Sequence, residues 1–405
     1  MSSEFGKTVW EKSRALQQSG RDANQIAKVL FQDDDLGHNY GIGIVLSGDG
    51  KPVASSATVL KYIKAELETS GAGTYQNSNA IMQKVKEAVL RWQQIPETHW
   101  PHFKIALPSD AGTGAVKTAV EMALQLDPGS HTLGIEELGW PAYKAIAKAA
   151  RINTKEFPAE GIISGDGVLP IYQSGPMNTT GQVQQPDVIQ ERAVHAARHQ
   201  SHVVLDRAYS GFEFARLLSS NAYHDIMKKS YERQIKPFID QGASFSLCLS
   251  PTKAFITFAF RPCGLLLVFC PDSGTAEKTT TTMNATIRAR GSAFEHPATR
   301  GLAKAFVNDL AGLEAEHKAA LERLAAAENI WSALVKDTPI EYLYSDQYAG
   351  LFRNPKCKED AAVKIYNAHI YPVFSQGRCR QNITGIPDNR ELAKRHVAVF
   401  AEQCF

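Results

Sequence analysis

The sequence lacks any apolar run that approaches about 18–20 residues, the length that a helix needs to cross a bilayer. Its first residues, MSSEFGKTVWEKSRAL, hold no apolar core of the signal-peptide type. Long blocks of one charge are also missing, since 44 basic side chains are interspersed with 42 acidic ones. These absences argue against a membrane or nucleic-acid partner, and we expect a cytoplasmic protein.

Cysteine is scarce and unpaired in this chain. The six cysteines are scattered without any CxxC pair, at Cys248, Cys263, Cys270, Cys357, Cys379 and Cys404. Such spacing argues against a zinc site and against a disulfide scaffold, and it fits a reducing compartment. We therefore expect no bound metal.

What the sequence does contain is an alternation of strand-like and helix-like segments. Apolar runs predict strands at 103–107, 132–135, 152–157, 202–206, 245–249 and 264–269. Helices are predicted at 115–126, 141–150, 187–198, 212–219 and 222–239. This alternation predicts an α/β fold whose mostly parallel sheet has helices on both faces.

The ends of the chain differ from its middle. Helices are expected at 8–31, 56–69 and 78–94, with a short extended run at 41–46, and a long helical stretch at 298–334 exceeds ordinary helix length. A chain of 405 residues suggests roughly two domains. We expect a large domain over 50–310, and a smaller α/β domain built from 1–49 and 311–405.

The stretch from Phe245 to Asp272 is the centre of the chemistry. Two buried-strand patterns, FSLCL and GLLLVF, flank Ser250-Pro251-Thr252-Lys253. Apolar surroundings desolvate a lysine, which lowers the pKa of its amine and makes it a nucleophile and base. The alternative is a solvated lysine on a loop between two strands.

A second candidate site follows the apolar run FKIAL. The loop PSDAGTG leads from this strand into a helix, an arrangement whose first-turn amides can hold a phosphate. The dinucleotide pattern GxGxxG is not met, so a tight turn without a ligand is the alternative. In the expected sheet, Asp110, Gly112, Asp206, Tyr209 and Ser250 fall at the carboxyl ends of strands, where ligands collect.

Several motifs occur in an order that resembles a known family. They are NTTG at 178–181, DRAY at 206–209, SPTK at 250–253 with Arg261, and GR at 377–378. From NYGIGI at 39–44 onward, the chain resembles the fold-type I aminotransferases that use pyridoxal phosphate, and within them the aspartate and aromatic enzymes. The resemblance implies a seven-stranded-type sheet and ping-pong transfer of an amino group from an L-amino acid to a 2-oxo acid.

The resemblance implies roles around the cofactor ring. Lys253 matches the lysine that holds the cofactor as a Schiff base and later moves the proton. Asp206 matches the carboxylate that pairs with the pyridine nitrogen, while Tyr209 and Asn178 would hydrogen-bond the phenolic oxygen. Trp140 falls where the family stacks an aromatic side chain on the ring, although a tryptophan of the core is the alternative.

The family also implies a phosphate site and a dimer. Gly112, Thr113, Ser250 and Arg261 would hold the phosphate, because an arginine can bind the dianion through two hydrogen bonds. Tyr75 would reach the same phosphate from the other subunit of a homodimer with shared active sites, although a tyrosine on a surface loop is the alternative.

On the substrate side, Arg378 matches the arginine that grips the α-carboxylate, with Gly41 close to that group. Asn178 and Trp140 would also contact the amino acid. Aligned on Ser292, Arg288 matches a partner-subunit arginine that binds the distal carboxylate of aspartate or glutamate, and Arg290 is the alternative if the alignment slips by two. An aromatic substrate could also fit, so the preferred donor and acceptor stay open.

The chain departs from the family pattern at Ala111, Thr179 and Ala254, where a serine, a proline and an asparagine are usual. A lyase or decarboxylase on the same fold therefore remains an alternative. A serine acyl-enzyme using Ser250-x-x-Lys253 is a remote one, because the Ser-Asp-Asn and Lys-Thr-Gly elements of that class are not matched. A non-enzymatic binding protein is a further alternative, although such proteins usually lack part of the catalytic set.

Overall fold

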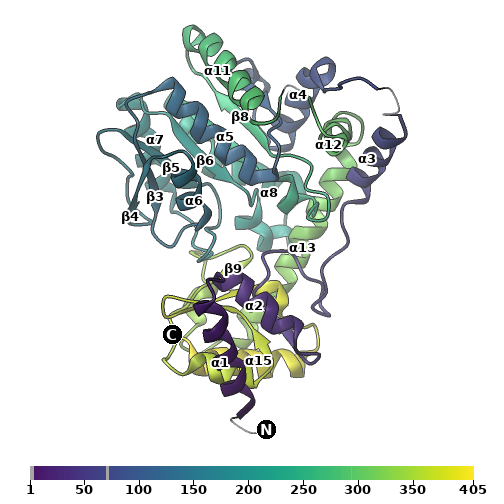
Figure 1. The fold of residues 1–405 in the computed structure, drawn as a ribbon, viewed down its shortest axis with the longest axis vertical. Helices are drawn as coiled ribbons and strands as arrows, with labels where there is room; N and C mark the ends of the chain where they lie inside the picture. Colours follow the sequence, from purple (N-terminus) through teal and green to yellow (C-terminus); the bar gives the residue numbers. More distant parts are fainter. Residues whose placement is uncertain (1–3, 70–72, 293) are drawn as a thin grey trace.

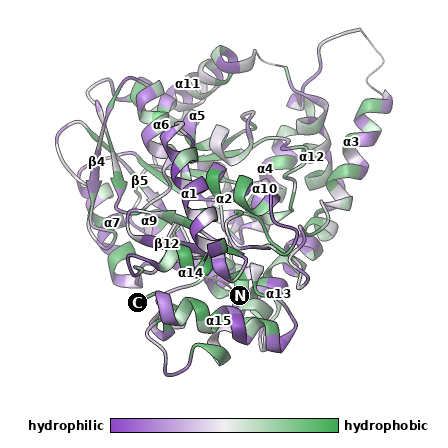
Figure 2. Cartoon of the chain, turned by 60° about the horizontal axis from the view of Figure 1, so that its bottom comes forward, coloured by the Kyte–Doolittle hydropathy of each residue, from purple (hydrophilic) through white to green (hydrophobic). Residues whose placement is uncertain are grey.

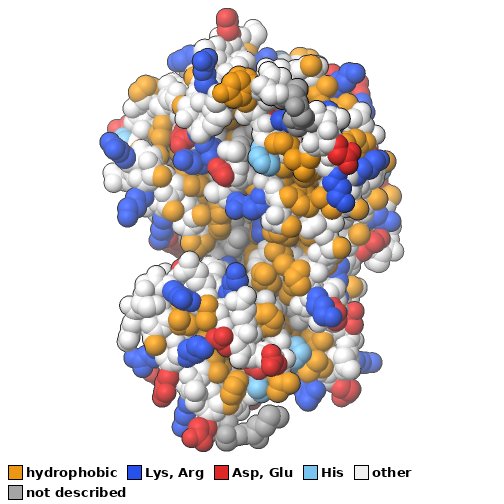
Figure 3. Space-filling model, turned by 45° about the vertical axis from the view of Figure 1, so that its right-hand side comes forward, with side chains coloured by type: hydrophobic (Ala, Val, Ile, Leu, Met, Phe, Trp, Pro, Cys, Tyr) orange, Lys and Arg blue, Asp and Glu red, His pale blue; other side chains and the backbone are white. Residues whose placement is uncertain are grey.

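The computed structural model describes residues 4–69, 73–292 and 294–405. Figure 1 shows a larger upper lobe around a sheet and a smaller lower lobe in which both termini lie. Helix α13 (Leu310–Leu334) runs from the upper lobe toward the lower one. In the space-filling view of Figure 3 the molecule narrows to a waist between the two lobes. Among the described residues, no helix combines the length and apolar character needed to cross a bilayer.

The upper lobe is organised around a seven-stranded sheet with the order β2-β8-β7-β6-β5-β3-β4. Its strands are β2 (Phe103–Ala106), β3 (Thr132–Glu136), β4 (Asn153–Phe157), β5 (Val168–Gln173), β6 (Val203–Arg207), β7 (Phe245–Leu249) and β8 (Leu265–Phe269). The strands from β7 to β4 run parallel, whereas β8 is antiparallel to both of its neighbours. The expected mostly parallel α/β fold is therefore confirmed.

Helices cover both faces of this sheet. Successive residues of one strand belong to different cores: Leu247 faces one and Cys248 the other. On one face lie α5 (Ala111–Leu126), α6 (Ala142–Ala149) and α11 (Ser273–Gly291). On the other lie α4 (Met82–Trp92), α7 (Pro186–Arg198), α8 (Tyr223–Gln234), α12 (Pro297–Asn308) and α13. A strand buried on both faces reads as a continuous apolar run, as β7 and β8 do.

Two of the expected long helices are each divided. The stretch 8–31 forms α1 (Glu4–Gln18) and α2 (Ala23–Gln32), because Gly20 has φ of 88° and the Asp22 side chain caps the second helix by accepting from the amides of Asn24 and Gln25. The stretch 298–334 divides at Asp309, which caps α13 in the same way. Both breaks lie at capping residues that start a new helix.

Apart from one helix of 13 residues, the remaining elements of the upper lobe are short. They are α3 (Ala57–Thr69), η1 (Asn79–Ile81), η2 (Glu97–His102), η3 (Phe212–Ser219), α9 (Lys236–Asp240) and α10 (Pro251–Ala254). Most helices are amphipathic, and in Figure 2 hydrophobic and hydrophilic residues alternate along their ribbons.

The lower lobe joins the two ends of the chain. Helix α1 packs on α14 (Ala361–Asn367), and β1 (His38–Asn39) pairs in parallel with β10 (Ile370–Tyr371). A three-stranded antiparallel sheet has the order β11-β12-β9. Its strands are β9 (Phe352–Arg353), β11 (Val373–Ser375) and β12 (Arg378–Asn382), and η4 (Glu341–Tyr344), η5 (Ile383–Gly385) and α15 (Arg390–Gln403) complete the lobe.

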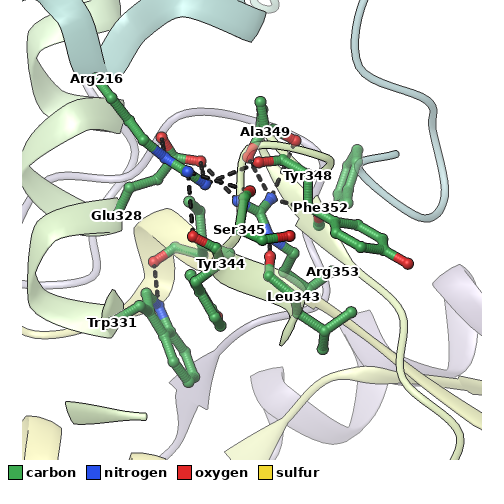
Figure 4. Close-up of polar contacts among 12 residues, drawn as sticks. Arg216, Glu328, Trp331, Leu343, Tyr344, Ser345, Tyr348, Ala349, Phe352 and Arg353 are labelled. Carbon is green, nitrogen blue, oxygen red and sulfur yellow. Dashed lines mark hydrogen bonds and ion pairs between the residues drawn. The ribbon is translucent and has the colours of Figure 1, made fainter. Parts of the chain in front are cut away.

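A buried ionic network ties the lobes together (Figure 4). Glu328 of α13 accepts from Arg216 of η3 at 2.9 Å and from Arg353 of β9 at 2.6 Å. Nearby, the Trp331 indole donates to the carbonyl of Ile383 at 3.0 Å. Removing one partner of such a buried pair costs about 3–5 kcal/mol, so this network fixes the small lobe against the sheet.

Candidate active site

A cavity of about 340 Å³ opens at the carboxyl ends of the parallel strands. Its lining includes nine residues singled out from the sequence: Gly112, Thr113, Trp140, Asn178, Asp206, Tyr209, Ser250, Lys253 and Arg261. These residues lie at or just after the ends of β2, β3, β5, β6, β7 and the loop before β8. The sheet therefore brings together side chains from segments that are far apart in the sequence.

Lys253 lies in α10, directly after β7. Its amine donates to the carbonyl of Gly43 at 2.6 Å and lies 5.7 Å from the centre of the Tyr209 ring. Burial, with Arg380 adding to it, lowers the pKa of Lys253 to about 8. A substantial fraction of this amine is therefore neutral near pH 8, which makes it available as a nucleophile and base.

Asp206 lies one residue before the end of β6. Burial raises the pKa of this carboxyl to about 6, although a hydrogen bond from Tyr143 and the charge of Lys253 oppose the rise. The Tyr143 hydroxyl donates to Asp206 Oδ2 at 2.7 Å. Tyr143 is a site residue that sequence reasoning missed, because nothing in the GWPAY segment indicates which strand end its side chain faces.

Asn178 and Tyr209 line one side of the cavity. The Asn178 amide nitrogen Nδ2 lies 3.5 Å from the Tyr209 hydroxyl, and the Asn178 backbone N–H donates to Gln173 Oε1 at 2.9 Å. Burial raises the pKa of Tyr209, so its hydroxyl stays protonated at neutral pH. The pair therefore presents an O–H group and an amide to whatever occupies the cavity.

The start of α5 forms the opposite end of the cavity. The helix begins at Ala111, four residues before the expected start, so Gly112 and Thr113 lie in its first turn, where amides have no intrahelical acceptor. A Cβ added to Gly112 would lie 2.7 Å from Ser250 Oγ, so only glycine leaves this space open. Arg261 donates to the carbonyl of Asp110 at 3.3 Å, which holds its guanidinium beside the turn. This end of the cavity is therefore suited to bind an anion.

Several buried polar atoms in the lining have no hydrogen-bond partner among the described residues. They are Gln173 Nε2, Ser174 Oγ, Asn178 Oδ1 and Thr252 Oγ1. Unpaired buried polar atoms are costly, so their gathering in one cavity indicates a polar ligand. With an anion site at one end and a buried carboxylate and lysine at the other, the residues present fit pyridoxal phosphate.

Arg378 does not reach this cavity, and Arg380 lies closer to it. The guanidinium of Arg378 donates to the carbonyl of Asn354 at 2.8 Å. Arg380, two residues further along β12, donates to the carbonyl of Gly41 at 2.8 Å and lowers the pKa of Lys253. The structure thus favours Arg380 in place of Arg378 as the cation beside Gly41. One sign of this alternative was present in the sequence, a second arginine two residues after Arg378. The spacing of the family motif did not show which of the two arginines faces Gly41.

Three other expected site residues lie outside the cavity, at a separate groove of about 870 Å³. Arg288 and Ser292 line this groove, and Tyr75, which is 78% exposed, stacks on Phe294 with ring centres 4.2 Å apart. Arg290 instead donates to the carbonyl of Gly114 at 2.8 Å and to Thr118. Arg290 also lines the groove, but these hydrogen bonds engage it within its own chain.

Comparison with known proteins agrees with this geometry. Residues 41–261 match the family model described as aminotransferase class I and II. No curated protein sequence matches the chain. Among solved structures, an aromatic-amino-acid aminotransferase from Burkholderia pseudomallei, covalently bound to pyridoxal phosphate, is similar with a TM-score of 0.77 and 18% identity over 94% of this chain and 96% of that one. The aspartate aminotransferase of Plasmodium falciparum has a TM-score of 0.74 and 16% identity over 94% and 97%.

Proposed function

This chain belongs to the aminotransferase class I and II family, and we propose that the cavity beside Lys253 binds pyridoxal 5′-phosphate and moves an amino group between an L-amino acid and a 2-oxo acid. The observation that carries the proposal is the pair of Lys253 and Asp206 in one buried cavity. The pKa of the lysine is lowered to about 8 and that of the carboxyl is raised to about 6, so each group is close to its working protonation state at neutral pH.

The phosphate end of the cofactor would bind at the start of α5. The amides of Gly112 and Thr113, the hydroxyl of Ser250 and the guanidinium of Arg261 supply the donors. Ala111 lacks a hydroxyl, so the phosphate receives one contact fewer here than in the usual family pattern. A helix N-terminus and an arginine still give this anion both a favourable dipole and a permanent positive charge.

The ring end of the cofactor would face Asp206. When bound, the cofactor supplies an electron-accepting ring that stabilises negative charge on the α-carbon of the amino acid. The Asp206 carboxylate favours a protonated ring nitrogen, and the Tyr143 hydroxyl keeps that carboxylate ionised and oriented. Trp140 would cover the ring, while Tyr209 and Asn178 would hydrogen-bond its phenolic oxygen. The four residues of these contacts other than Tyr143 line the cavity, and Tyr143 acts on it through Asp206.

Lys253 then moves the proton. With the cofactor bound, the Lys253 Nζ would take the proton from the α-carbon of the amino acid as a base and would donate it back as an acid. Arg380 grips the α-carboxylate by its two-pronged geometry, and Gly41 and Gly43 close this side of the cavity. The oxo acid product would then leave, and a second 2-oxo acid would enter to complete a ping-pong cycle.

We further propose a homodimer that accepts dicarboxylate donors. Arg288 and Ser292 line the groove away from the cavity of their own chain, and Tyr75 stacks on Phe294 of the same groove. This placement supports a role in the active site of a partner subunit. There Tyr75 would contact the phosphate, and Arg288 would pair with the distal carboxylate of aspartate or glutamate. An unpaired second charge in a closed site costs several kcal/mol, which a guanidinium offsets.

The division into domains and the location in the cell complete the proposal. Residues 50–310 form the cofactor-binding domain, and 1–49 with 311–405 form the small domain that brings Arg380 to the site. The scattered cysteines favour the cytoplasm.

A half-reaction assay tests the function. The purified chain, loaded with pyridoxal phosphate, is mixed with L-glutamate, L-aspartate or L-phenylalanine in the absence of a 2-oxo acid. We expect the visible absorbance of the bound cofactor to fall and one equivalent of the matching oxo acid to appear. Release of carbon dioxide or of ammonia, without a stoichiometric aminated cofactor, would instead identify a decarboxylase or a lyase.

A further inference from the structure

Three of the six cysteines meet in the small lobe, although they are far apart in the sequence. Cys357 lies on a short segment between the start of β12 and the last residues of the chain. On one side, Cys357 and Cys404 face each other as an antiparallel pair. On the other, the backbone N–H of Cys357 donates to Gly377 at 3.0 Å, and that of Cys379 donates to Pro355 at 3.0 Å.

Cys357 and Cys404 are paired in the antiparallel arrangement in which opposite side chains come closest. The flanking hydrogen bonds run from Lys358 N–H to Gln403 at 2.9 Å and from Phe405 N–H to Lys356 at 3.0 Å. The two cysteines are therefore a non-hydrogen-bonded pair, whose Cα atoms lie about 4.5 Å apart in antiparallel strands. This spacing falls in the range of about 4.4–6.8 Å that a disulfide needs.

The third thiol is in contact with this pair. The Cys379 and Cys404 side chains lie within hydrogen-bonding reach, and Cys379 is fully buried. Cys404 is 2% exposed, whereas Cys357 is only half-buried and its thiol donates to the carbonyl of Gly377 at 3.3 Å. Within the part of the chain that the structure describes, no group of three ligating side chains could hold a metal ion. The cluster is therefore a thiol site and has no metal-site geometry.

We propose that Cys357 and Cys404 form a redox modification site that closes to a reversible disulfide, with a low-molecular-weight disulfide such as oxidised glutathione as the oxidant. The half-buried Cys357 sulfur attacks the oxidant, forming a mixed disulfide and releasing one glutathione thiol. The Cys404 sulfur then attacks the Cys357 sulfur and releases the second glutathione thiol. The two cysteine protons end on the two released thiols, so atoms and electrons balance.

Burial sets the speed of this exchange. It raises the pKa of Cys357 to about 11, with the charge of Arg378 opposing the rise, so little thiolate is present at neutral pH. The reaction is therefore slow. Reduced glutathione reverses the reaction: its thiol attacks the Cys357 sulfur and releases Cys404, and a second glutathione thiol then attacks the mixed disulfide, releasing Cys357 and oxidised glutathione. Disulfides of this kind in reducing compartments are usually transient and redox-sensing.

The closed bond would tie the C-terminal end to the segment that carries Asn354. The Asn354 side chain donates to Thr179 at 2.9 Å, and Thr179 follows Asn178 of the cavity. The site thus lies next to the active centre without belonging to it. The inference does not depend on the reaction, because it rests on the placement of the thiols alone.

The test uses the full chain loaded with pyridoxal phosphate. It is incubated with oxidised glutathione, blocked with iodoacetamide, digested without reduction and analysed by mass spectrometry. We expect the number of reactive thiols in the denatured chain to fall by two from six, and the peptide with Cys357 to be linked to the peptide with Cys404. Dithiothreitol should restore both thiols.

Variants serve as controls for the pair. Cys357→Ser should abolish the linked peptide, whereas Cys379→Ser should keep it, because Cys379 takes no part in the bond. The proposal is overturned if oxidised glutathione links no peptides in the wild-type chain, if the link joins Cys379 to Cys404 instead, or if the link involves Cys248, Cys263 or Cys270 of the large lobe.

Discussion

Two walls meet at Lys253 and are built in different ways: the residues that line the cavity come from the large lobe, and a second wall of small-lobe residues contacts Lys253 from beside the lining. On the large-lobe side, Trp140, Asn178, Asp206 and Ser250 each lie at or just after the end of a strand in one sheet. On the small-lobe side, contacts join residues far apart in the sequence: Lys253 to Gly43 across 210 positions and Arg380 to Gly41 across 339. One wall follows from local sequence pattern, whereas the other depends on how two lobes pack.

A change in the wall formed by the strand ends of the large lobe should have the largest effect on activity. Lys253→Ala removes the only amine that lines the cavity among the described residues, and with it both nucleophile and base. We expect turnover to fall by about 10⁴-fold or more, while the chain still holds cofactor noncovalently. Steady-state assays and equilibrium dialysis measure the two quantities. Turnover near the wild-type rate would contradict the assignment.

A matched pair of arginine variants tests the wall that the small lobe provides. Arg380→Ala should lower kcat/KM for every amino acid by about a thousandfold, as expected for removing one partner of a buried charge pair. Arg378→Ala should change kcat/KM by less than about threefold, because its guanidinium contacts Asn354 outside the cavity. A larger loss of kcat/KM in Arg378→Ala than in Arg380→Ala would mean that Arg378 binds the α-carboxylate.

A second pair of arginine variants tests whether a partner subunit contributes a side chain to the active site. Arg288→Ala should lower kcat/KM for aspartate and glutamate by on the order of ten- to a hundredfold, the effect of losing a charged hydrogen bond of about 1.5–3 kcal/mol. Aromatic donors should change little. Arg290→Ala should affect all donors equally, because Arg290 braces the start of α5. Equal losses for all donors with Arg288→Ala would instead mean a structural role.

Tyr143→Phe should have the smallest effect and a distinct pH signature. The Tyr143 hydroxyl lowers the pKa of Asp206, which burial has raised to about 6. Losing this donor should raise that pKa by up to about one unit, the worth of one hydrogen bond. Since the ionised carboxylate is the working form, activity should then be lost at a higher pH on the acidic limb of the kcat/KM profile.

A control separates this effect from a loss of packing. Tyr231→Phe removes a buried hydroxyl outside the cavity lining and should leave the acidic limb where it is. An unchanged acidic limb in Tyr143→Phe would show that the Tyr143 hydroxyl does not tune Asp206.

The fold was predictable where burial on both faces makes a strand a continuous apolar run. Strand β7 has the predicted bounds, and β8 differs by one residue. Strand β5 was missed, because Pro170 and the polar end of VLPIYQ interrupt its pattern. Helix α11 was missed because its threonine-rich sequence shows no apolar stripe.

The residues of the candidate site also differ in how far the sequence predicts them. Asp206, Ser250 and Lys253 could be found because a strand pattern precedes each of them. Arg380 and Tyr143 could not be, since their roles depend on contacts with Gly41 and with Asp206 that no local pattern encodes. Two arginines separated by one residue on β12 look alike in the sequence, and the packing of the lobes distinguishes them.

The central claim is that Lys253 is the cofactor lysine of this sheet-built cavity. The direct test is to load the chain with pyridoxal phosphate, reduce it with borohydride and map the modified peptide by mass spectrometry. The account predicts one phosphopyridoxyl group per chain, on Lys253, with none in Lys253→Ala. A modification at another lysine, or none in the wild-type chain, would contradict it.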